Sequence, residues 1–379
     1  MKVLIVGGYG VFGGRLARML RGEPGLTLLI AGRSRRKAER FIQSLDPRQN
    51  AEAVRLEPLV LDRRTISAGQ LAGIGAALVV DCTGPFQAYG DAPYRLATAC
   101  IEAGVDYLDL ADGTAFVAGI AGLDAAARAA GVAVISGAST CPALTGAVVR
   151  ALTPGWRAVH AISAGIAPSP FADVGLTVIQ AIASYAGRPV RLLREGGTVE
   201  IGGLCETRRA DILPPGGPGL RRVLFSAVDT PDLVELPRLW PELRSVWFGA
   251  GPRPELLHGL LVGLARLIRA GVPIPLLALA PLIHAVKVRL AWGADRGGMF
   301  VEARGLGPDG APAAARWALI AEGNDGPNIP AMAAAALVVR KARGGRLDPG
   351  ARSAVGDLTL ADFRPWFERF SIRSGFDPA

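Results

Sequence analysis

A glycine-rich loop near the N-terminus joins an apolar run directly to an amphipathic segment. Lys2–Val6 reads KVLIV, residues 7–14 read GGYGVFGG, and residues 15–20 read RLARML. The loop fits G-x-G-x-x-G through Gly8, Gly10 and Gly13, and also G-x-x-G-x-x-G starting at Gly7. A strand that turns through such a loop into a helix requires the helix to pack closely on a sheet. This pattern constrains the fold more than any other feature of the chain.

The spacing gives each glycine a physical task. Gly7 permits the tight turn after the strand, Gly10 lets a phosphate approach the backbone, and Gly13 allows close helix packing. The N–H groups and the dipole at the helix start attract phosphates. We therefore expect a dinucleotide here, and a glycine-rich turn without a ligand is the alternative. The expected contacts are Gly7, Gly8, Tyr9, Gly10, Val11, Phe12 and Gly13.

The end of the second apolar run, Leu26–Ala31, bears on which dinucleotide is bound. An acidic residue there would accept hydrogen bonds from the ribose 2′-hydroxyl of NAD. Here Arg33-Ser-Arg-Arg-Lys37 follows, with no carboxylate before Glu39. Arg33, Ser34 and Lys37 suit a 2′-phosphate, so we predict NADP(H) as the cofactor. A solvated helix start is the alternative for this basic cluster.

The first 140 residues alternate between apolar runs and helical patterns. The runs are Val3–Val6, Leu26–Ala31, Val54–Leu61, Ala77–Cys82, Tyr107–Leu110 and Val132–Ile135, and the helical segments are Gly13–Arg21, Ser34–Leu45, Asp91–Ala103 and Ala115–Ala130. Runs without polar alternation are typical of parallel strands buried on both faces. The fold class predicted is α/β, with a Rossmann-type doubly wound parallel sheet over residues 1–145.

The strict alternation ends after this domain, which predicts a mixed α+β domain over residues 146–330. Strand-like runs there include Ser245–Ala250 and Met299–Ala303, and helices include Glu255–Ala270 and Pro275–Arg289. Two further helices, Pro330–Arg343 and Leu360–Phe370, fall in residues 331–379. We expect this C-terminal part to pack back on the first domain.

Two further segments are candidates for cofactor contacts. Asp62 follows the third strand, where it lies near the adenine or serves as a cap or turn residue. The fourth strand continues into Thr83, Gly84, Pro85 and Phe86. The carboxyl edge of an open parallel sheet is where ligands bind, so we expect this turn to contact the nicotinamide end.

Residues 81–90, DCTGPFQAYG, and 99–113, ACIEAGVDYLDLADG, resemble the saccharopine dehydrogenase-like oxidoreductases. That family carries a C-x-G-P-F-x-x-Y-G element and an A-G-x-x-Y-x-D-L element at these places. Residues 323–330, GNDGPNIP, are similar to its G-D-G-P-Y-x-P turn, with Asn328 where an aromatic residue is common. The resemblance implies a Rossmann domain, a substrate and dimerisation domain, a homodimer, NAD(P) and hydride transfer.

One departure bears on the substrate. Residues 137–145 read GASTCPALT where many relatives have G-F-D-S-x-P-S-D, so the acidic positions are absent. This disfavours an amino-acid substrate of the kind that saccharopine reductases use. We predict a reductase that transfers a hydride from NADPH to a C=N or C=C bond of a small, partly apolar substrate. The alternative is a non-catalytic NADP-binding protein associated with a membrane.

Candidate catalytic residues lie near the expected carboxyl edge of the sheet. Asp112, Tyr89 and Cys141 could donate a proton or orient a substrate. Each has a structural alternative, such as a cap for Asp112 or packing for Cys141. No Ser-His-Asp or paired-carboxylate pattern indicates a hydrolase.

Composition excludes other function classes. The net charge is +9, but no basic run is interleaved with aromatic residues, so we expect no nucleic-acid partner. The four cysteines lie far apart without zinc-ligand spacing, so we expect free thiols and no metal. With no signal-peptide pattern at the N-terminus, we expect a cytoplasmic protein.

Residues 256–286 are very apolar but are interrupted by Arg266, Arg269 and three prolines. A spanning helix needs about 18 or more apolar residues in succession, so we do not expect one. A pair of buried helices or a dimer face is the first interpretation. A peripheral hairpin on a membrane surface is the second.

Overall fold

The computed structural model describes residues 1–45, 54–173 and 175–377. The chain divides into two compact units. The first unit contains Met1–Ala143 and Asn328–Ala354, and the second contains Leu144–Pro327 and Val355–Ala379.

The first unit is built on a parallel seven-stranded sheet with the order β15-β6-β5-β4-β1-β2-β3. Its strands are β1 (Lys2–Val6), β2 (Leu26–Gly32), β3 (Val54–Val60), β4 (Leu78–Asp81), β5 (Asp106–Asp109), β6 (Ala133–Ser136) and β15 (Gly350–Ser353). The strand order reverses between β1 and β4, which creates the crevice where such sheets bind ligands. The predicted Rossmann-type sheet is confirmed.

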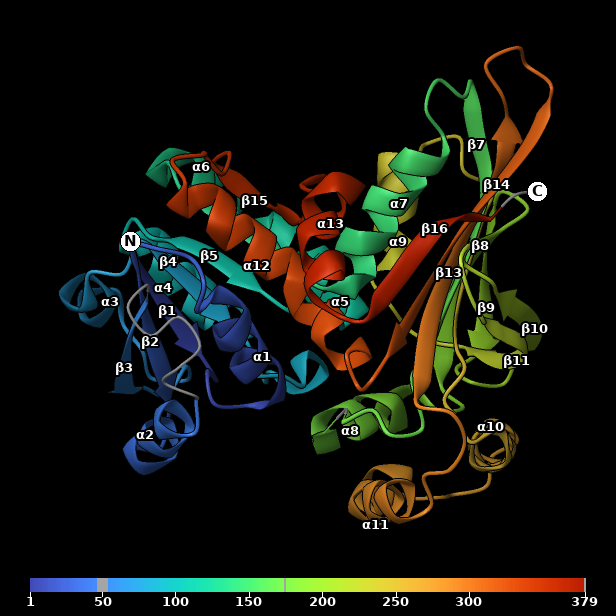
Figure 1. Ribbon diagram of the computed structural model, residues 1–379, viewed down its shortest axis with the longest axis horizontal. Coiled ribbons are helices and arrows are strands. Elements are labelled where there is room, and N and C mark those ends of the chain that lie inside the picture. Colours follow the sequence, from blue (N-terminus) through green and yellow to red (C-terminus); the bar gives the residue numbers. More distant parts are fainter. Residues whose placement is uncertain (46–53, 174, 378–379) are drawn as a thin grey trace. The chain divides into compact units, whose positions relative to one another are not determined.

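Helices cover both faces of this sheet (Figure 1). They are α1 (Val11–Leu20), α2 (Arg35–Gln43), α3 (Ala68–Ile74), α4 (Arg95–Glu102), α5 (Thr114–Gly119), α6 (Asp124–Ala130) and α12 (Ile329–Ala342). Side chains of α3, α4 and α6 pack with Tyr107 of β5 in one buried cluster. Helix α1 contacts α12 and packs beside α2, where the Arg18 guanidinium lies 5.0 Å from the Phe41 ring centroid.

Burial on both faces holds for the central strands but not for β3. Every residue of β4, β5 and β6 is buried, whereas β3 is mostly half-exposed. Strand β3 lies at the edge of the sheet and pairs only with β2 among the described residues. The expectation of full burial is wrong for this strand.

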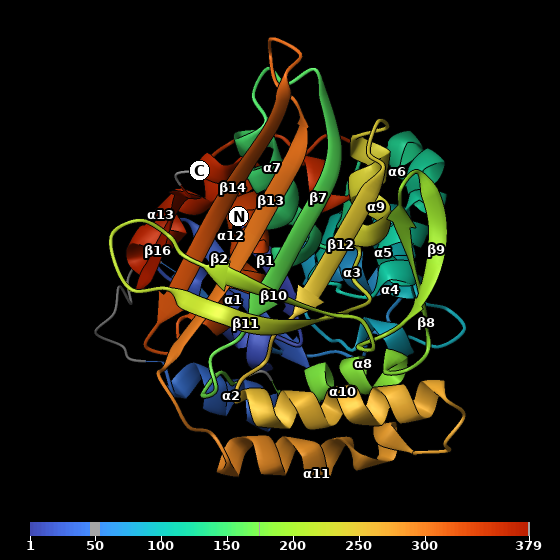
Figure 2. The same cartoon turned by 90° about the vertical axis from the view of Figure 1, so that its right-hand side faces the viewer.

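The second unit contains a mixed sheet with the order β10-β11-β12-β7-β13-β14-β16, whose broad face Figure 2 shows. Its strands are β7 (Ala158–Ala167), β10 (Thr207–Ile212), β11 (Leu220–Ala227), β12 (Ser245–Ala250), β13 (Arg296–Leu306), β14 (Pro312–Glu322) and β16 (Ile372–Asp377), and β8 (Pro189–Arg194) and β9 (Gly197–Gly202) form a separate hairpin. The helices are α7 (Thr145–Leu152), α8 (Gly175–Tyr185), α9 (Asp232–Leu239), α10 (Glu255–Arg269), α11 (Leu276–Arg289) and α13 (Leu360–Arg369). The predicted mixed α+β domain is confirmed.

The C-terminal part is divided between the units. Helix α12 and strand β15 belong to the first unit, where Lys341 Nζ lies 2.7 Å from Asp106 Oδ2. Helix α13 belongs instead to the second unit, where Phe367 packs on Trp317 and β16 pairs with β14. The expectation that the whole of 331–379 packs on the first domain is wrong, because amphipathicity shows that α13 has a buried face but not what covers it.

Candidate nucleotide-binding site

The glycine loop is anchored to the end of β2. The backbone N–H groups of Gly7 and Gly8 donate to Ala31 O at 2.8 and 3.1 Å, and Gly10 N–H donates to Gly7 O at 2.8 Å. Gly7 has a φ of +78°, which side-chain-bearing residues rarely adopt. The loop thus turns back on itself between β1 and α1.

Close approaches explain the other glycines. A Cβ on Gly13 would lie 2.3 Å from Gly7 O, and one on Gly8 would lie 2.9 Å from Ile5 O. A Cβ on Gly10 would meet only Gly7 O, at 3.0 Å, among the described atoms within 4 Å. Gly8 and Gly13 therefore serve packing within the protein, while Gly10 leaves the outer side of the loop accessible to a ligand.

Gly10 is also the N-cap of α1 and provides no capping side chain. The first N–H groups of any helix lack intrahelical partners. In α1 these groups belong to Val11, Phe12 and Gly13, and together with the helix dipole they suit a phosphate. The geometry therefore supports the predicted phosphate contacts.

Tyr9 links the glycine loop to the end of β2. A Cβ on Gly32 would lie 2.5 Å from the Tyr9 hydroxyl oxygen, so the ring lies directly over this glycine. Ser34 N–H donates to the same oxygen at 3.1 Å. Gly32 was not among the predicted site residues, although a glycine between a buried strand and a basic cluster was the available signal.

The basic cluster forms the start of α2. Ser34 is the N-cap, and its Oγ accepts from Lys37 N–H at 3.4 Å. Arg33 and Lys37 are exposed, whereas Arg35 pairs with Glu39 at 2.8 Å. Two cations and a helix N-terminus thus lie beside Tyr9 and the glycine loop, which favours an anion there.

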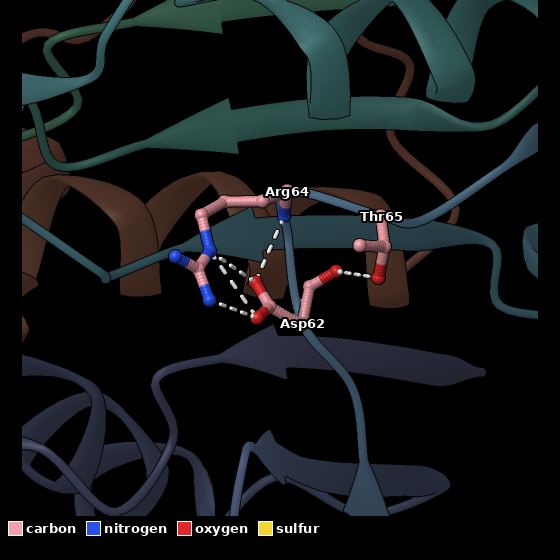
Figure 3. Close-up of polar contacts among 3 residues, drawn as sticks. All are labelled: Asp62, Arg64 and Thr65. Atoms are coloured by element: carbon pink, nitrogen blue, oxygen red, sulfur yellow. Dashed lines mark hydrogen bonds and ion pairs between the residues drawn. The ribbon is translucent and has the colours of Figure 1, made fainter.

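Asp62 lies in the turn after β3 and is held by Arg64 (Figure 3). The Arg64 guanidinium contacts both carboxylate oxygens at 2.6 to 3.2 Å, and Arg64 N–H donates to Oδ1 at 3.0 Å. These hydrogen bonds lower the pKa of Asp62 to about 2. The contacts match the turn interpretation, and an adenine contact stays a prediction.

The turn after β4 is organised by a buried carboxylate. Asp81 Oδ1 accepts from Thr83 N–H at 3.0 Å and from Thr83 Oγ1 at 2.6 Å, and Asp81 Oδ2 accepts from the Tyr89 hydroxyl at 2.8 Å. A Cβ on Gly7 would lie 3.0 Å from Thr83 Cγ2. The predicted Thr83–Phe86 turn therefore lies against the glycine loop.

Tyr89 is enclosed by this turn. Its ring stacks on Phe86 with centroids 4.7 Å apart, and the Arg63 guanidinium carbon lies 3.4 Å from its centroid. Burial raises the pKa of the Tyr89 hydroxyl. These contacts favour a role in holding the turn over proton donation, for which Tyr89 was a candidate.

Asp109 holds the loops after β5 and β6 in the same way. It is the register partner of Asp81 in the parallel β4–β5 pair. Its Oδ1 accepts from Ala111 N–H, Ser136 Oγ and Gly137 N–H at 2.8 to 3.0 Å. Its Oδ2 is buried and has no hydrogen-bond partner among the described residues. Burial raises the pKa of Asp109 to about 7.

The other two catalytic candidates lie on loops of the first unit. Asp112 is exposed and accepts from Gln87 Nε2 at 3.2 Å. Cys141 is half-buried in the turn Thr140–Leu144. The contacts do not distinguish a proton donor, so both assignments stay predictions.

Residues 3–135 match the family model described as the saccharopine dehydrogenase NADP binding domain. The resemblance drawn from the motifs is confirmed over this range, and the first unit contains an NADP-binding domain of this kind. No curated protein gives a significant match to the sequence.

Among solved structures, apo saccharopine dehydrogenase (L-Glu forming) from Saccharomyces cerevisiae matches with a TM-score of 0.63 at 12% identity, over 100% of both chains. A probable dehydrogenase from Thermotoga maritima matches with a TM-score of 0.45 at 9% identity, over 99% of this chain and 98% of the other. A meso-dapdh mutant with DAP from Clostridium tetani gives 0.42 at 12% identity, over 96% and 98%. The yeast structure shows the shared fold, and the domain match supports an oxidoreductase.

Proposed function

We propose that the protein is an NADPH-dependent oxidoreductase that reduces a C=N or C=C bond of a small, partly apolar substrate. The observation that carries the cofactor assignment is the end of β2. Arg33, Ser34 and Lys37 gather at the start of α2, beside Tyr9 of the glycine loop. No carboxylate that would repel a 2′-phosphate lies between β2 and Glu39.

Bound NADPH would supply the hydride, while the protein positions the cofactor and excludes water. The amides at the start of α1 would hold the pyrophosphate. The Thr83–Phe86 turn, fixed by Asp81, would lie under the nicotinamide ribose. The loop after β6 supports the substrate class, because Gly137–Thr140 is buried and carries no acidic side chain.

The cofactor assignment is tested by Arg33→Asp. Losing a charge-assisted hydrogen bond and adding a repulsive charge should weaken NADPH binding by about 10- to 100-fold. Binding of NADH should change by less than about threefold, since NADH has no 2′-phosphate and a single exposed charge contributes little to its binding. Arg36→Asp is the matched control, because it makes the same charge change one turn along the exposed helix start. Equal losses for both cofactors in Arg33→Asp would refute the 2′-phosphate contact.

The catalytic assignment is tested by following NADPH oxidation with panels of imines and enoyl compounds. We expect substrate-dependent oxidation that Arg33→Asp slows at limiting NADPH. Tight NADPH binding without turnover on either panel would instead favour the non-catalytic NADP-binding protein.

A further inference from the structure

One end of the second unit carries an exposed apolar surface. Of the sixteen exposed large hydrophobic side chains in the described chain, eleven lie between Leu256 and Trp292. Leu256, Leu260, Leu282 and Val288 are each 60 to 68% exposed. So dense a gathering in 37 residues is unlike the scattered hydrophobic residues of an ordinary surface. We call the exposed apolar side chains between Leu256 and Trp292 the hairpin surface.

The hairpin surface is formed by α10, α11 and the segments that follow each helix. Helix α11 packs on α8 and buries Leu276 and Ala280, and α10 buries His258, Val262 and Ala265. Both views show α10 and α11 side by side (Figures 1 and 2). Within the part of the chain that the structure describes, each helix thus packs on one side and is exposed on the other, so the interpretation as a pair of buried helices is wrong.

The charges of this segment all have one sign. Between Glu255 and Asp295 there is no acidic residue, and the charged side chains are Arg266, Arg269, Lys287 and Arg289. Arg266 donates to Cys205 O at 3.1 Å and Lys287 donates to Ala172 O, which holds both at the margins of the helices. Trp292, 49% exposed, follows α11. Exposed leucines, basic residues and a tryptophan are the composition of an interfacial helix pair.

The same charges disfavour pairing of this surface with itself. A two-fold dimer brings one patch against its own copy. Arg269 lies 3.8 Å from Glu200 outside this segment, but Arg266, Lys287 and Arg289 would face their copies without a carboxylate from residues 256–294 to pair with them. A lipid surface with anionic headgroups complements them instead, at about 1 kcal/mol per basic residue near the surface.

We propose that the hairpin surface docks on an anionic lipid bilayer, with α10 and α11 lying in the plane of the interface. No helix in the described residues is long and apolar enough to cross a membrane, so the docking is peripheral. The leucines enter the headgroup boundary while Arg289 meets the lipid phosphates. This inference does not depend on the proposed catalytic activity.

The test is flotation of the full chain with vesicles of phosphatidylcholine alone or mixed with phosphatidylglycerol. We expect binding to the mixed vesicles that weakens at high salt. Leu260→Gln/Leu282→Gln should lower the partition coefficient by at least about tenfold, because it removes two apolar side chains from the interface. Arg289→Gln should lower it by about fivefold.

Phe376→Gln is the matched control, since Phe376 is 52% exposed in the same unit but lies on β16. It should bind as the wild type does, and circular dichroism should show that all variants are folded. Equal binding to both vesicle types would refute the anionic surface. Absence of vesicle binding, with a dimer in light scattering that the double leucine variant abolishes, would identify a second copy of the chain as the occupant.

Discussion

Replacing the buried carboxyl of Asp109 by an amide should change how the stability of the first unit depends on pH. Asp109→Asn can keep the three hydrogen bonds that Oδ1 accepts, because its amide oxygen can occupy the same place. It removes the ionisation of a side chain whose pKa is raised to about 7 by burial. The substitution therefore separates the hydrogen bonds of the site from its charge.

The sign follows from proton linkage. The folded chain holds this proton with a pKa of about 7, whereas an unfolded Asp has a pKa of about 3.9. Between about pH 4 and pH 7 the folded state therefore binds more protons, so its stability falls as pH rises and is constant above that range. The difference between these two pKa values, at about 1.36 kcal/mol for each tenfold change in proton affinity, limits the contribution of Asp109 to the pH dependence of stability to about 4 kcal/mol. Burial also raises the pKa of Asp81, which adds a slope of the same sign.

The assay is urea unfolding and amide hydrogen exchange from pH 4.5 to pH 8. All six tryptophans lie in the second unit, so exchange in β5 and β6 is needed to follow the first. We expect the stability of Asp109→Asn relative to wild type to rise by about 2 to 4 kcal/mol across this range. Asp62→Asn is the control, because its lowered pKa of about 2 places its effect below pH 4. Parallel curves for wild type and Asp109→Asn would refute the reasoning.

Three further substitutions test the loops around the nucleotide. Gly13→Ala should cost about 1 to 3 kcal/mol of stability and weaken NADPH binding, since its Cβ would lie 2.3 Å from Gly7 O. Gly122→Ala is the control, because a Cβ there meets no described atom within 4 Å, and it should leave both thermal unfolding and NADPH titration nearly unchanged. Tyr89→Phe keeps the ring but removes the bond to Asp81, so it should cost about 1 to 3 kcal/mol and raise KM for NADPH; a fall in kcat alone would instead support proton donation by Tyr89. Ser34→Ala should lower the stability by about 1 kcal/mol, because the N-cap of α2 is lost, and should weaken the binding of NADPH more than that of NADH. Equal losses of affinity for the two cofactors would contradict a place for Ser34 beside the 2′-phosphate.

The core of the first unit was predictable because its signals are local. Most central strands are apolar runs, and β1, the glycine loop and α1 are continuous in sequence. Strand β15, Gly350–Ser353, was missed because GARS is not an apolar run. It joins the sheet because β6 leaves an open edge, and such pairing depends on a neighbour that is remote in the chain.

Part of the candidate site was predicted because its signals are also local in the sequence. The glycines are recognised by their spacing, and the basic cluster is recognised by its charge. The sequence did not indicate that Asp81 and Asp109 hold these turns, because an acidic residue at the end of a strand does not reveal its neighbours in the sheet. Their importance comes from lying side by side in the sheet, fully buried, with three loops bonded to them.

The sequence alone determined that a glycine loop joins a buried strand to a helix, and that cations, not a carboxylate, follow the second strand. These are properties of residues that are close together in the sequence, so they do not depend on how the rest of the chain is arranged. Only the tertiary structure decided that Tyr9 bridges the loop to the basic cluster and that buried carboxyls hold the facing turns. It also decided that α10 and α11 leave their leucines uncovered, because burial depends on which elements pack together and periodicity does not specify the partner.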